Sequence, residues 1–313
     1  MKNKIKIITL LLLLTFVLTG CTTQLRDNEN NIVQNPETGQ NLPEKILCRP
    51  TDEKLVELYT QHADFAIEEL PRCENMRIRD ANRRAGLWDQ IFVIPLAWYI
   101  IRIAGVVGNY GIALMLAGIA IRVLLTPMTI KTMRQSQNMK KAQPELAKLE
   151  QKYKDKKDQE SMMMKSREML AIHKKHNVSL MGSCLNAFLQ LPLFLAFFGA
   201  INRTPAIFEE TLWTLNLGMT PRVGLFEHGN YLYLVLILLI VITTYASFKF
   251  NMTTMTANPD QQKMQKTMFN IMIVMITVMS FSLPTAIALY WIVSSSVMVV
   301  MNLIFKRQPK ETK

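Results

Sequence analysis

Residues 108–127 read GNYGIALMLAGIAIRVLLTP, and this stretch decides the fold of the chain. A run of about 20 apolar residues is the length that an α-helix needs to cross a bilayer. The run holds one charged residue, Arg122, which lies past its middle and close to a very basic segment. A charge at the centre of a membrane helix costs roughly 2.5–3.5 kcal/mol and therefore usually marks a functional site. The stretch predicts a membrane helix that carries a functional arginine.

Four further apolar stretches follow in this chain of 313 residues, of which 50% are hydrophobic. The five predicted spans cover approximately residues 108–128, 180–200, 231–249, 267–283 and 285–305. None of them contains Asp, Glu or His, so the spans offer Arg122 no acidic partner. We expect an all-α polytopic membrane protein with five transmembrane helices.

The basic residues gather on alternate sides of these spans. The net charge is +7 over residues 131–176, +2 over 249–266 and +3 over 306–313, whereas it is −4 over 22–89 and −1 over 201–230. Short loops rich in Lys and Arg stay in the cytoplasm. Five spans, with the N-terminus outside and the C-terminus in the cytoplasm, satisfy all five segments at once.

The N-terminus has the pattern of a secretory signal. Three lysines within the first six residues precede a short apolar run, Ile7–Val17. The tetrapeptide Leu18-Thr19-Gly20-Cys21 that follows resembles the bacterial lipoprotein box, in which the cysteine receives lipid. We therefore expect a lipoprotein signal peptide over residues 1–20 and lipid attachment at Cys21. A retained signal anchor is the alternative.

Residues 21–86 are predicted to form an extracytoplasmic tether. The part over 22–50 is polar and poor in apolar residues, which is typical of a flexible segment. Residues 51–85 have helical spacing and predict a small helical element, too short to bury a core. Cys48 and Cys73 both lie outside, where a disulfide is permitted, but they could equally stay free.

Residues 87–104 predict a helix that lies in the outer membrane interface. Gln90 and Arg102 bracket only 11 apolar residues, too few to span. Trp88 and Trp98 are residue types that favour the interface. We expect a kink near Pro95. The alternative is that this segment extends the first span.

Residues 131–177 predict a cytoplasmic hairpin of two antiparallel amphipathic helices, which turns near residues 156–159. Its basic face fits acidic lipid, RNA or a ribosome surface, although a solvated face is the commoner explanation. The methionines Met162, Met163, Met164 and Met169 suit apolar binding or packing between the two helices. His173 and His176 have no third ligand in the sequence, so we expect no metal site.

Polar residues recur at three- and four-residue steps in several spans, and they supply the candidate site residues. The candidates are Arg122, Asn186, Gln190, Trp291 and Ser294. Such stripes often join membrane helices. The functional alternative is a wet cavity, because a guanidinium keeps its charge and needs water, phosphate or a carboxylate. Arg122 could instead extend to the cytoplasmic headgroups. No nucleotide-binding motif or catalytic triad occurs, and we expect no enzyme and no cofactor.

Several motifs occur together in order along residues 87–306. They are Asn109-Tyr110-Gly111, Ile121–Thr129, Gln143-Pro144-Glu145, Gly182-Ser183-Cys184, Leu189–Phe194, Pro259–Lys263, Leu283-Pro284 and Ala288–Ser294. Through these motifs the chain resembles the YidC/Oxa/Alb family of membrane protein insertases, in its short lipoprotein form. Residues 307–313 follow this core as a basic cytoplasmic tail.

The resemblance implies five spans around a hydrophilic groove that opens to the cytoplasm. Arg122 matches the groove arginine, Gln190 a polar residue before the proline of the second span, and Trp291 a groove aromatic. The implied partners are nascent membrane proteins, membrane lipid, the Sec translocon and the ribosome, with no specific nucleic acid. The chain departs from the family pattern at Gly118 and Asn186, where relatives often carry other residue types.

The sequence therefore predicts a membrane protein insertase and chaperone in the bacterial cytoplasmic membrane. A secondary transporter or channel for an anionic solute is the main alternative, and a structural lipoprotein scaffold is a third. The sequence has no inverted repeat and no intramembrane acid for ion coupling, which disfavours transport.

Overall fold

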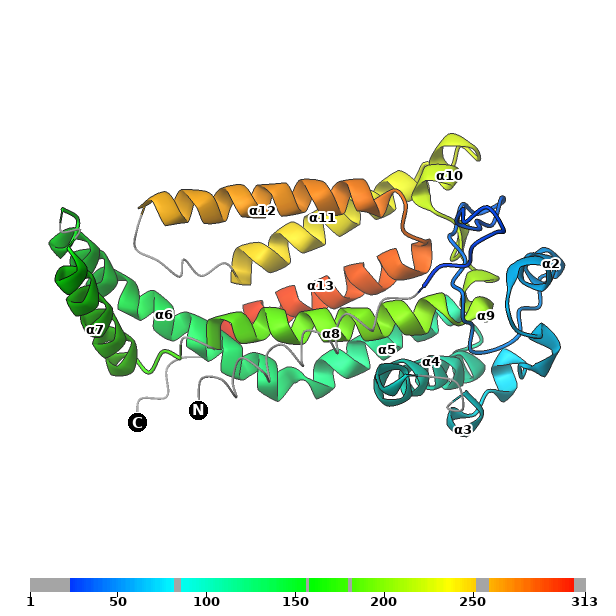
Figure 1. Ribbon diagram of the computed structural model, residues 1–313, viewed down its shortest axis with the longest axis horizontal. Helices are drawn as coiled ribbons and strands as arrows, with labels where there is room; N and C mark the ends of the chain where they lie inside the picture. Colours follow the sequence, from blue (N-terminus) through cyan, green and yellow to red (C-terminus); the bar gives the residue numbers. More distant parts are fainter. Residues whose placement is uncertain (1–22, 82–85, 156–157, 180–181, 252–258, 307–313) are drawn as a thin grey trace. The chain divides into compact units, whose positions relative to one another are not determined.

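The computed structural model describes residues 23–81, 86–155, 158–179, 182–251 and 259–306 of the chain (Figure 1). The α-helices are α2 Glu53–His62, α3 Ile78–Ala81, α4 Ile94–Val107, α5 Tyr110–Leu124, α6 Thr126–Lys152, α7 Gln159–Lys175, α8 Gly182–Asn202, α9 Pro205–Phe208, α10 Pro221–Phe226, α11 Leu232–Asn251, α12 Pro259–Ser280 and α13 Thr285–Lys306. Short 3-10 turns η1 Ile67–Glu69 and η2 Cys73–Asn75, the π-turn η4 Asp89–Val93, and the strands β1 Thr211–Leu212 and β2 Leu215–Asn216 complete the described elements. The predominantly helical fold is as predicted.

Several of these helices are long and apolar enough to cross a membrane. Within the described ranges they are Asp89–Val107, Leu232–Lys249 and Thr285–Phe305, and the bent pair α5 and α6 supplies a fourth candidate. Shorter apolar helices cover Gln190–Asn202 and Lys266–Ser280. The chain is thus a helical membrane protein, and the number of five spans stays a prediction.

The first predicted span ends earlier than expected. Helix α5 stops at Leu124, and α6 starts at Thr126 after a bend of 60°. Pro127 explains the break, because a proline has no N–H to donate and its ring clashes with the preceding helical turn. Leu125 accordingly leaves the helical region, at ψ 0°. The predicted span over 108–128 therefore contains a break near its C-terminal end.

The segment predicted to lie in the interface is one uninterrupted helical stretch from Asp89 to Val107. Its first turn is the π-turn η4, in which the Ile94 N–H donates to the Asp89 carbonyl. Pro95 follows directly after this π-turn, in the first turn of α4, and the kink expected near it stays a prediction. At 19 residues this stretch is long enough to span, so its location in the interface stays a prediction.

Helices α6 and α7 form the predicted antiparallel hairpin, although α6 begins at Thr126 (Figure 1). Lys165 early in α7 pairs with Glu150 late in α6 at 2.9 Å, and Lys175 late in α7 pairs with Glu145 at 2.8 Å. A small apolar cluster lies between the helices and contains Met139, Ala142, Leu146 and Val178, with Ile172 packed against it. Amphipathic patterning thus predicted this element correctly.

Residues 23–76, here called the N-terminal region, are folded. The prediction of a flexible segment over residues 22–50 is therefore wrong, whereas the helical element predicted within 51–85 is present as α2. The buried cluster of this region consists of Leu25, Val33, Leu42, Ile46, Leu55, Tyr59 and Ile67. Cys48 and Cys73 form a disulfide. The apolar residues are spaced irregularly, and turns and bridges bring them together. Periodicity therefore could not reveal this core. The predicted signal peptide and Cys21 lie outside the described residues.

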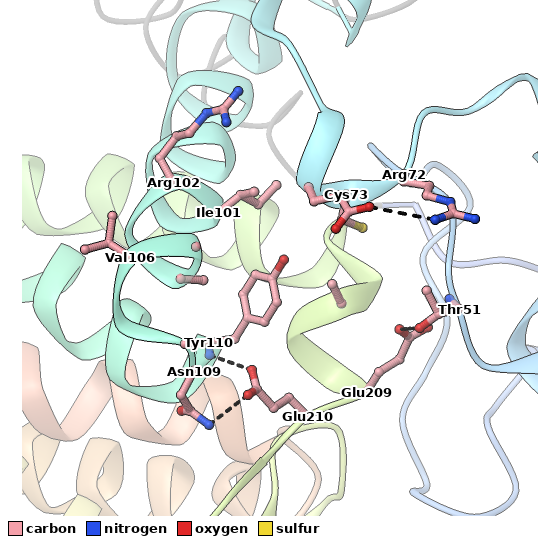
Figure 2. A pocket seen from close by; sticks show the side chains of 15 residues that line it. Thr51, Arg72, Cys73, Ile101, Arg102, Val106, Asn109, Tyr110, Glu209 and Glu210 are labelled. Carbon is pink, nitrogen blue, oxygen red and sulfur yellow. Dashed lines mark hydrogen bonds and ion pairs between the residues drawn. The ribbon is translucent and has the colours of Figure 1, made fainter.

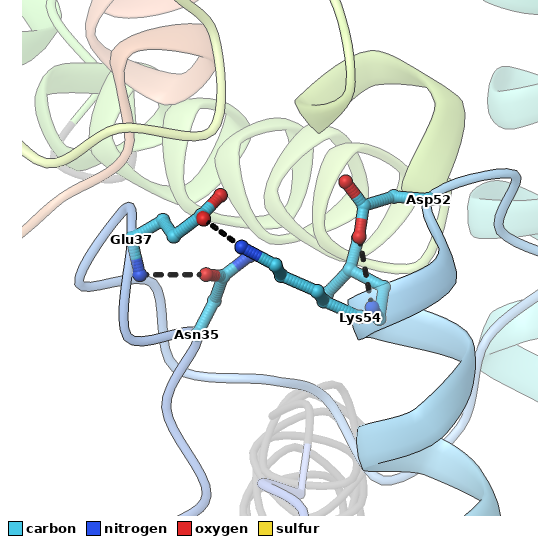
Figure 3. Close-up of polar contacts among 5 residues, drawn as sticks. Asn35, Glu37, Asp52 and Lys54 are labelled. Carbon is cyan, nitrogen blue, oxygen red and sulfur yellow. Dashed lines mark hydrogen bonds and ion pairs between the residues drawn. The ribbon is translucent and has the colours of Figure 1, made fainter.

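The N-terminal region is held by short polar contacts. Lys54 of α2 pairs with Glu37, whose N–H donates to the Asn35 side chain at 2.9 Å (Figure 3). Asp52 caps α2 by accepting the Leu55 N–H at 3.0 Å. The ion pair of Lys54 and Glu37 is exposed and contributes little on its own, whereas the loss of an N-cap such as Asp52 typically costs about 1 kcal/mol.

The N-terminal region also docks on the segment between α8 and α11. The Leu47 N–H donates to the Arg203 carbonyl at 2.8 Å, and the Thr220 N–H donates to the Thr38 carbonyl at 2.8 Å. Gly39 has a positive φ of 67°, and a Cβ there would lie 2.7 Å from Val223 Cγ2. Glycine is thus needed both for the turn and for the close approach to α10.

Candidate functional site

Arg122 lies in the last turn of α5, and only 6% of it is exposed. Its guanidinium donates twice to the Ser294 hydroxyl of α13, from Nε at 2.9 Å and from Nη2 at 2.5 Å. Ser294 is itself 2% exposed. The predicted spans contain no acidic residue, but a hydroxyl from the last span meets the guanidinium.

This contact orients the guanidinium without neutralising it. A serine hydroxyl accepts hydrogen bonds but carries no charge, and an arginine in a protein cannot lose its proton. The two bonds direct the side chain toward α13. They do not support the alternative in which Arg122 extends to the lipid headgroups. A fixed cation is a site for hydrogen bonding and for attraction of negative charge.

The bend next to Arg122 is stabilised by threonine hydroxyls. Thr126 Oγ1 donates to the Arg122 carbonyl at 3.2 Å, and Thr129 Oγ1 donates to the Leu125 carbonyl at 3.0 Å. Such bonds to the carbonyl four residues earlier commonly accompany helix bending. They also satisfy backbone acceptors near Pro127, which has no N–H of its own. The sequence Thr126-Pro127 thus explains why α5 ends shortly after Arg122.

Trp291 on α13 packs against α8. Its ring meets Phe194 edge-on, with centroids 5.1 Å apart and planes at 75°. One residue earlier, Tyr290 stacks on Phe197 at 4.1 Å. Edge-to-face and offset stacks are the favoured aromatic geometries. Trp291 is therefore held in place by the aromatic residues of α8.

The predicted groove residues fall into two compact units. Arg122 and Ser294 belong to the unit of residues 121–189, 240–278 and 294–313, and the structure brings these two side chains together. Gln190, which is half-buried, and Trp291 belong to the unit of residues 1–120, 190–239 and 279–293. The side chain of Asn186 lies outside the described part of the structure. A common groove for all five stays a prediction.

A buried ion pair that the sequence reading did not single out joins Asp89 and Arg203. The Arg203 Nη1 to Asp89 Oδ2 distance is 2.5 Å, and the two side chains are 8% and 14% exposed. The pair links η4 to the end of α8. The sequence offers little indication of this pair, because each residue stands at the end of an apolar stretch, where charged residues are common at the membrane interface.

Two adjacent carboxylates were also missed. Glu210 accepts from Asn109 Nδ2 at 2.9 Å and from the Tyr110 N–H at 2.5 Å, at the start of α5 (Figure 2). Glu209 accepts from the Thr51 N–H at 2.7 Å, next to the start of α2. Negative charge at a helix N-terminus is stabilising. The two glutamates thus attach the starts of two different helices to the same loop.

Glu209 and Glu210 line a pocket of about 840 Å³, together with Arg72, Arg102 and Tyr110 (Figure 2). The carboxylates are already hydrogen-bonded within the chain. The bond from Thr51 to Glu209 at this pocket joins the N-terminal region to the loop after α9.

The helical hairpin has its own polar centre at Glu145. Hydrogen bonds from Lys175 and then from His176 Nε2, at 2.8 and 3.0 Å, hold the pKa of Glu145 below its ordinary value. In the described ranges no three His, Cys, Asp or Glu side chains gather as a metal-binding group. His176 pairs with a carboxylate of α6.

Comparison with known proteins identifies relatives over most of the chain. Residues 102–312 match the family described as 60Kd inner membrane protein. A protein of Oceanobacillus iheyensis named Membrane protein insertase YidC is 32% identical over 227 residues, which cover 71% of this chain and 84% of the relative. Membrane protein insertase MisCA of Bacillus subtilis is 33% identical over 220 residues, covering 70% and 79%. Membrane protein insertase YidC of Alkalihalophilus pseudofirmus is 35% identical over 225 residues, covering 69% and 81%.

Proposed function

The chain belongs to the family of 60Kd inner membrane proteins, and we propose that it is a membrane protein insertase and chaperone that places newly made proteins in the cytoplasmic membrane. Three relatives at 32–35% identity carry the name of membrane protein insertase. This likeness, which extends over more than two thirds of the chain, is what supports the activity.

The observation that carries the mechanism is the fixed cation at Arg122. The Ser294 hydroxyl holds the guanidinium inside the helix packing and leaves its positive charge in place. An acidic or polar segment of a nascent protein is attracted to such a charge as it enters the membrane. In a medium of low dielectric constant this attraction is stronger than in water. Arg122 acts through its field and its hydrogen bonds, and no covalent step is required.

The surrounding architecture is proposed as five spans around a groove that opens to the cytoplasm. The spans correspond to the membrane part of α5 and to α8, α11, α12 and α13, with Asp89–Val107 lying at the outer interface. Gln190, Asn186 and Trp291 line the groove in this proposal. A hydrophilic groove shortens the apolar path that the polar end of a substrate has to cross, and its open flank releases the substrate helix into lipid.

The N-terminus is proposed to lie outside, with lipid at Cys21 after removal of the signal peptide. The basic hairpin of α6 and α7 and the C-terminus then face the cytoplasm, in agreement with the charge of the loops. The proposed partners are nascent membrane proteins and lipid, and the protein works alone or beside the Sec translocon and the ribosome.

Reconstitution tests the proposal. Purified protein in liposomes should insert a short single-span substrate whose translocated segment is acidic, and also a version in which Asn and Gln replace the acidic residues. Arg122→Ala should reduce insertion of the acidic version by about tenfold, which corresponds to about 1.4 kcal/mol, and the neutral version much less. Arg122→Lys keeps the positive charge but not the planar guanidinium with its several donors. We expect its insertion of the acidic substrate to lie between that of the wild type and that of Arg122→Ala.

The outcomes separate the candidate functions. Equal effects of Arg122→Ala on both substrates would remove the electrostatic role of the arginine and leave the insertase activity standing. Liposomes that take up small anions but insert neither substrate would identify a transporter or channel instead.

A further inference from the structure

A short hairpin between α9 and α10 carries a tryptophan at its tip. Strands β1 and β2 pair antiparallel, and Trp213 and Thr214 form the two-residue connection. The side chains of Leu212 and Leu215 are buried beneath the hairpin, whereas Trp213 is 87% exposed. Packing within the chain therefore does not account for a tryptophan at this position.

The backbone at Trp213 is also unfavourable for this residue type. Its φ is 54°, in the left-handed region that sterically disfavours residues with a large side chain. Two-residue hairpins normally place Asn, Asp or Gly at such positions. Among the described residues, the other non-glycine residues with positive φ are Asn30 and Asn177, a type that tolerates it. The turn itself thus favours a different residue from the one present.

Hydrogen bonds fix the hairpin to the start of α11. Asn230 Nδ2 donates to the Thr214 carbonyl at 3.3 Å, and the Asn216 N–H donates to the Tyr233 hydroxyl at 3.1 Å. Helix α11 begins at Leu232, and its residues 232–249 are long and apolar enough to cross a membrane. The hairpin is therefore attached to the N-terminal end of a candidate membrane span.

Two more exposed aromatic residues lie close to Asn230 in the sequence. Tyr231, directly before α11, is 76% exposed, and Phe226, at the end of α10, is 73% exposed. The Asn230 N–H donates to the Gly224 carbonyl at 2.9 Å, which ties α10 to the same turn. Exposed apolar residues continue along α11 from this aromatic group and include Leu234, Val235 and Leu238.

We propose that Trp213, with Tyr231 and Phe226, inserts into the boundary between the phospholipid headgroups and the acyl chains, in the leaflet at the N-terminal end of α11. Tryptophan and tyrosine favour this boundary because one part of the ring system is apolar and the other forms hydrogen bonds. The aromatic group is continuous with the lipid-exposed side of a candidate span, which identifies lipid as its occupant. The proposal depends on the chain lying in a membrane and not on insertase activity.

Depth-dependent fluorescence quenching tests this contact. The full chain is reconstituted in phosphatidylethanolamine and phosphatidylglycerol vesicles whose acyl chains carry bromine either near the headgroup or near the chain end. Trp213 emission is obtained as the difference between the wild type and Trp213→Phe. We expect shallow bromine to quench about half of this difference emission, deep bromine to quench it clearly less, and aqueous iodide to have little effect.

A second variant keeps the test valid if the phenylalanine disturbs the turn. Trp213→Asn removes the fluorophore and suits the positive φ, so its thermal stability in detergent should equal or exceed that of the wild type, and its difference spectrum should agree with that of Trp213→Phe. Quenching of Trp213 by iodide but not by brominated lipid would overturn the proposal in favour of a water-exposed tip. Resistance to both quenchers would also overturn it, because a protein partner or a second copy would then cover the tip.

Discussion

The buried pair of Asp89 and Arg203 makes a sharp prediction about stability. The two side chains meet at 2.5 Å and are only 14% and 8% exposed. Asp89→Asn retains the size and shape of the side chain but removes the negative charge, so the buried guanidinium loses its counterion. Breaking one partner of a buried pair costs about 3–5 kcal/mol. Since Leu47 of the N-terminal region also bonds to the Arg203 carbonyl, we expect docking of that region to weaken as well.

Thermal unfolding of the purified protein in detergent measures the effect. Globular proteins have an unfolding entropy of about 2.1 cal/mol/K per residue, so for this chain of 313 residues a loss of about 3–5 kcal/mol lowers the Tm by about 5–8 °C. The double variant Asp89→Asn with Arg203→Met removes both charges and should recover most of this loss, because no unpaired charge is then left buried. Limited proteolysis should cleave the N-terminal region fastest in Asp89→Asn, more slowly in the double variant and most slowly in the wild type.

A matched control is available in the N-terminal region. Glu37 and Lys54 form an ion pair whose side chains are 57% and 65% exposed. Removing this pair by Glu37→Gln should change stability by less than about 1 kcal/mol. The reasoning is refuted if Asp89→Asn lowers the Tm no more than Glu37→Gln does, or if the double variant is no more stable than the single one.

Three further predictions concern other contacts. Ser294→Ala should destabilise the protein by about 1.5–3 kcal/mol in thermal unfolding, because the buried Arg122 loses the acceptor of two hydrogen bonds. Ser294→Thr keeps the hydroxyl and is the control. If both variants lose the same stability, the hydroxyl does not have this role. The pKa of Glu145 is held below 4.5 by hydrogen bonds from a lysine and a histidine of the facing helix, so its stabilisation of the hairpin is fully present above pH 4.5 and is lost as the pH falls through the lowered value. Hydrogen exchange of α7 between pH 6 and 3 should show this loss, and Glu145→Gln should remove the pH dependence; a variant with the wild-type profile would exclude Glu145 as its origin. Reduction of the Cys48–Cys73 disulfide, which closes a loop over a separation of 25 residues, should destabilise the N-terminal region by about 3–4 kcal/mol and speed its proteolysis. Unchanged proteolysis in reductant would show that the buried cluster is sufficient without the disulfide.

The helical membrane architecture was largely predictable, since it depends on properties that are local in the chain. Apolar run length predicted the positions of α8, α11 and α13 to within a few residues, and amphipathic spacing predicted the hairpin of α6 and α7. Run length alone did not show the break after Leu124, because it ignores Pro127, at which the helix bends although the apolar residues continue. The helix predicted over residues 87–104 is present as the stretch Asp89–Val107, and its location in the interface stays a prediction.

The folded N-terminal region was not predictable from periodicity. Leu55 and Tyr59 of α2 have helical spacing, but the other buried residues come from irregular turns and from η1, and their spacing follows neither the helix nor the strand period. Seven irregularly placed apolar side chains and one disulfide are enough to hold it, and contacts with the loop after α8 add to its burial. Composition alone therefore predicts a tether, although this region has a buried apolar cluster and a disulfide.

By itself the sequence determined that this is a helical membrane protein, that Arg122 is a costly charge in the first span, and that Ser294 lies in a polar stripe of the last span. Hydropathy, net charge and helical spacing are local quantities, and they can be read without coordinates. Only the tertiary structure decided that these two residues meet, because they are 172 positions apart and no pattern pairs a given guanidinium with a given hydroxyl. The same holds for Asp89 with Arg203, whose partnership exists only once separate helices are packed together.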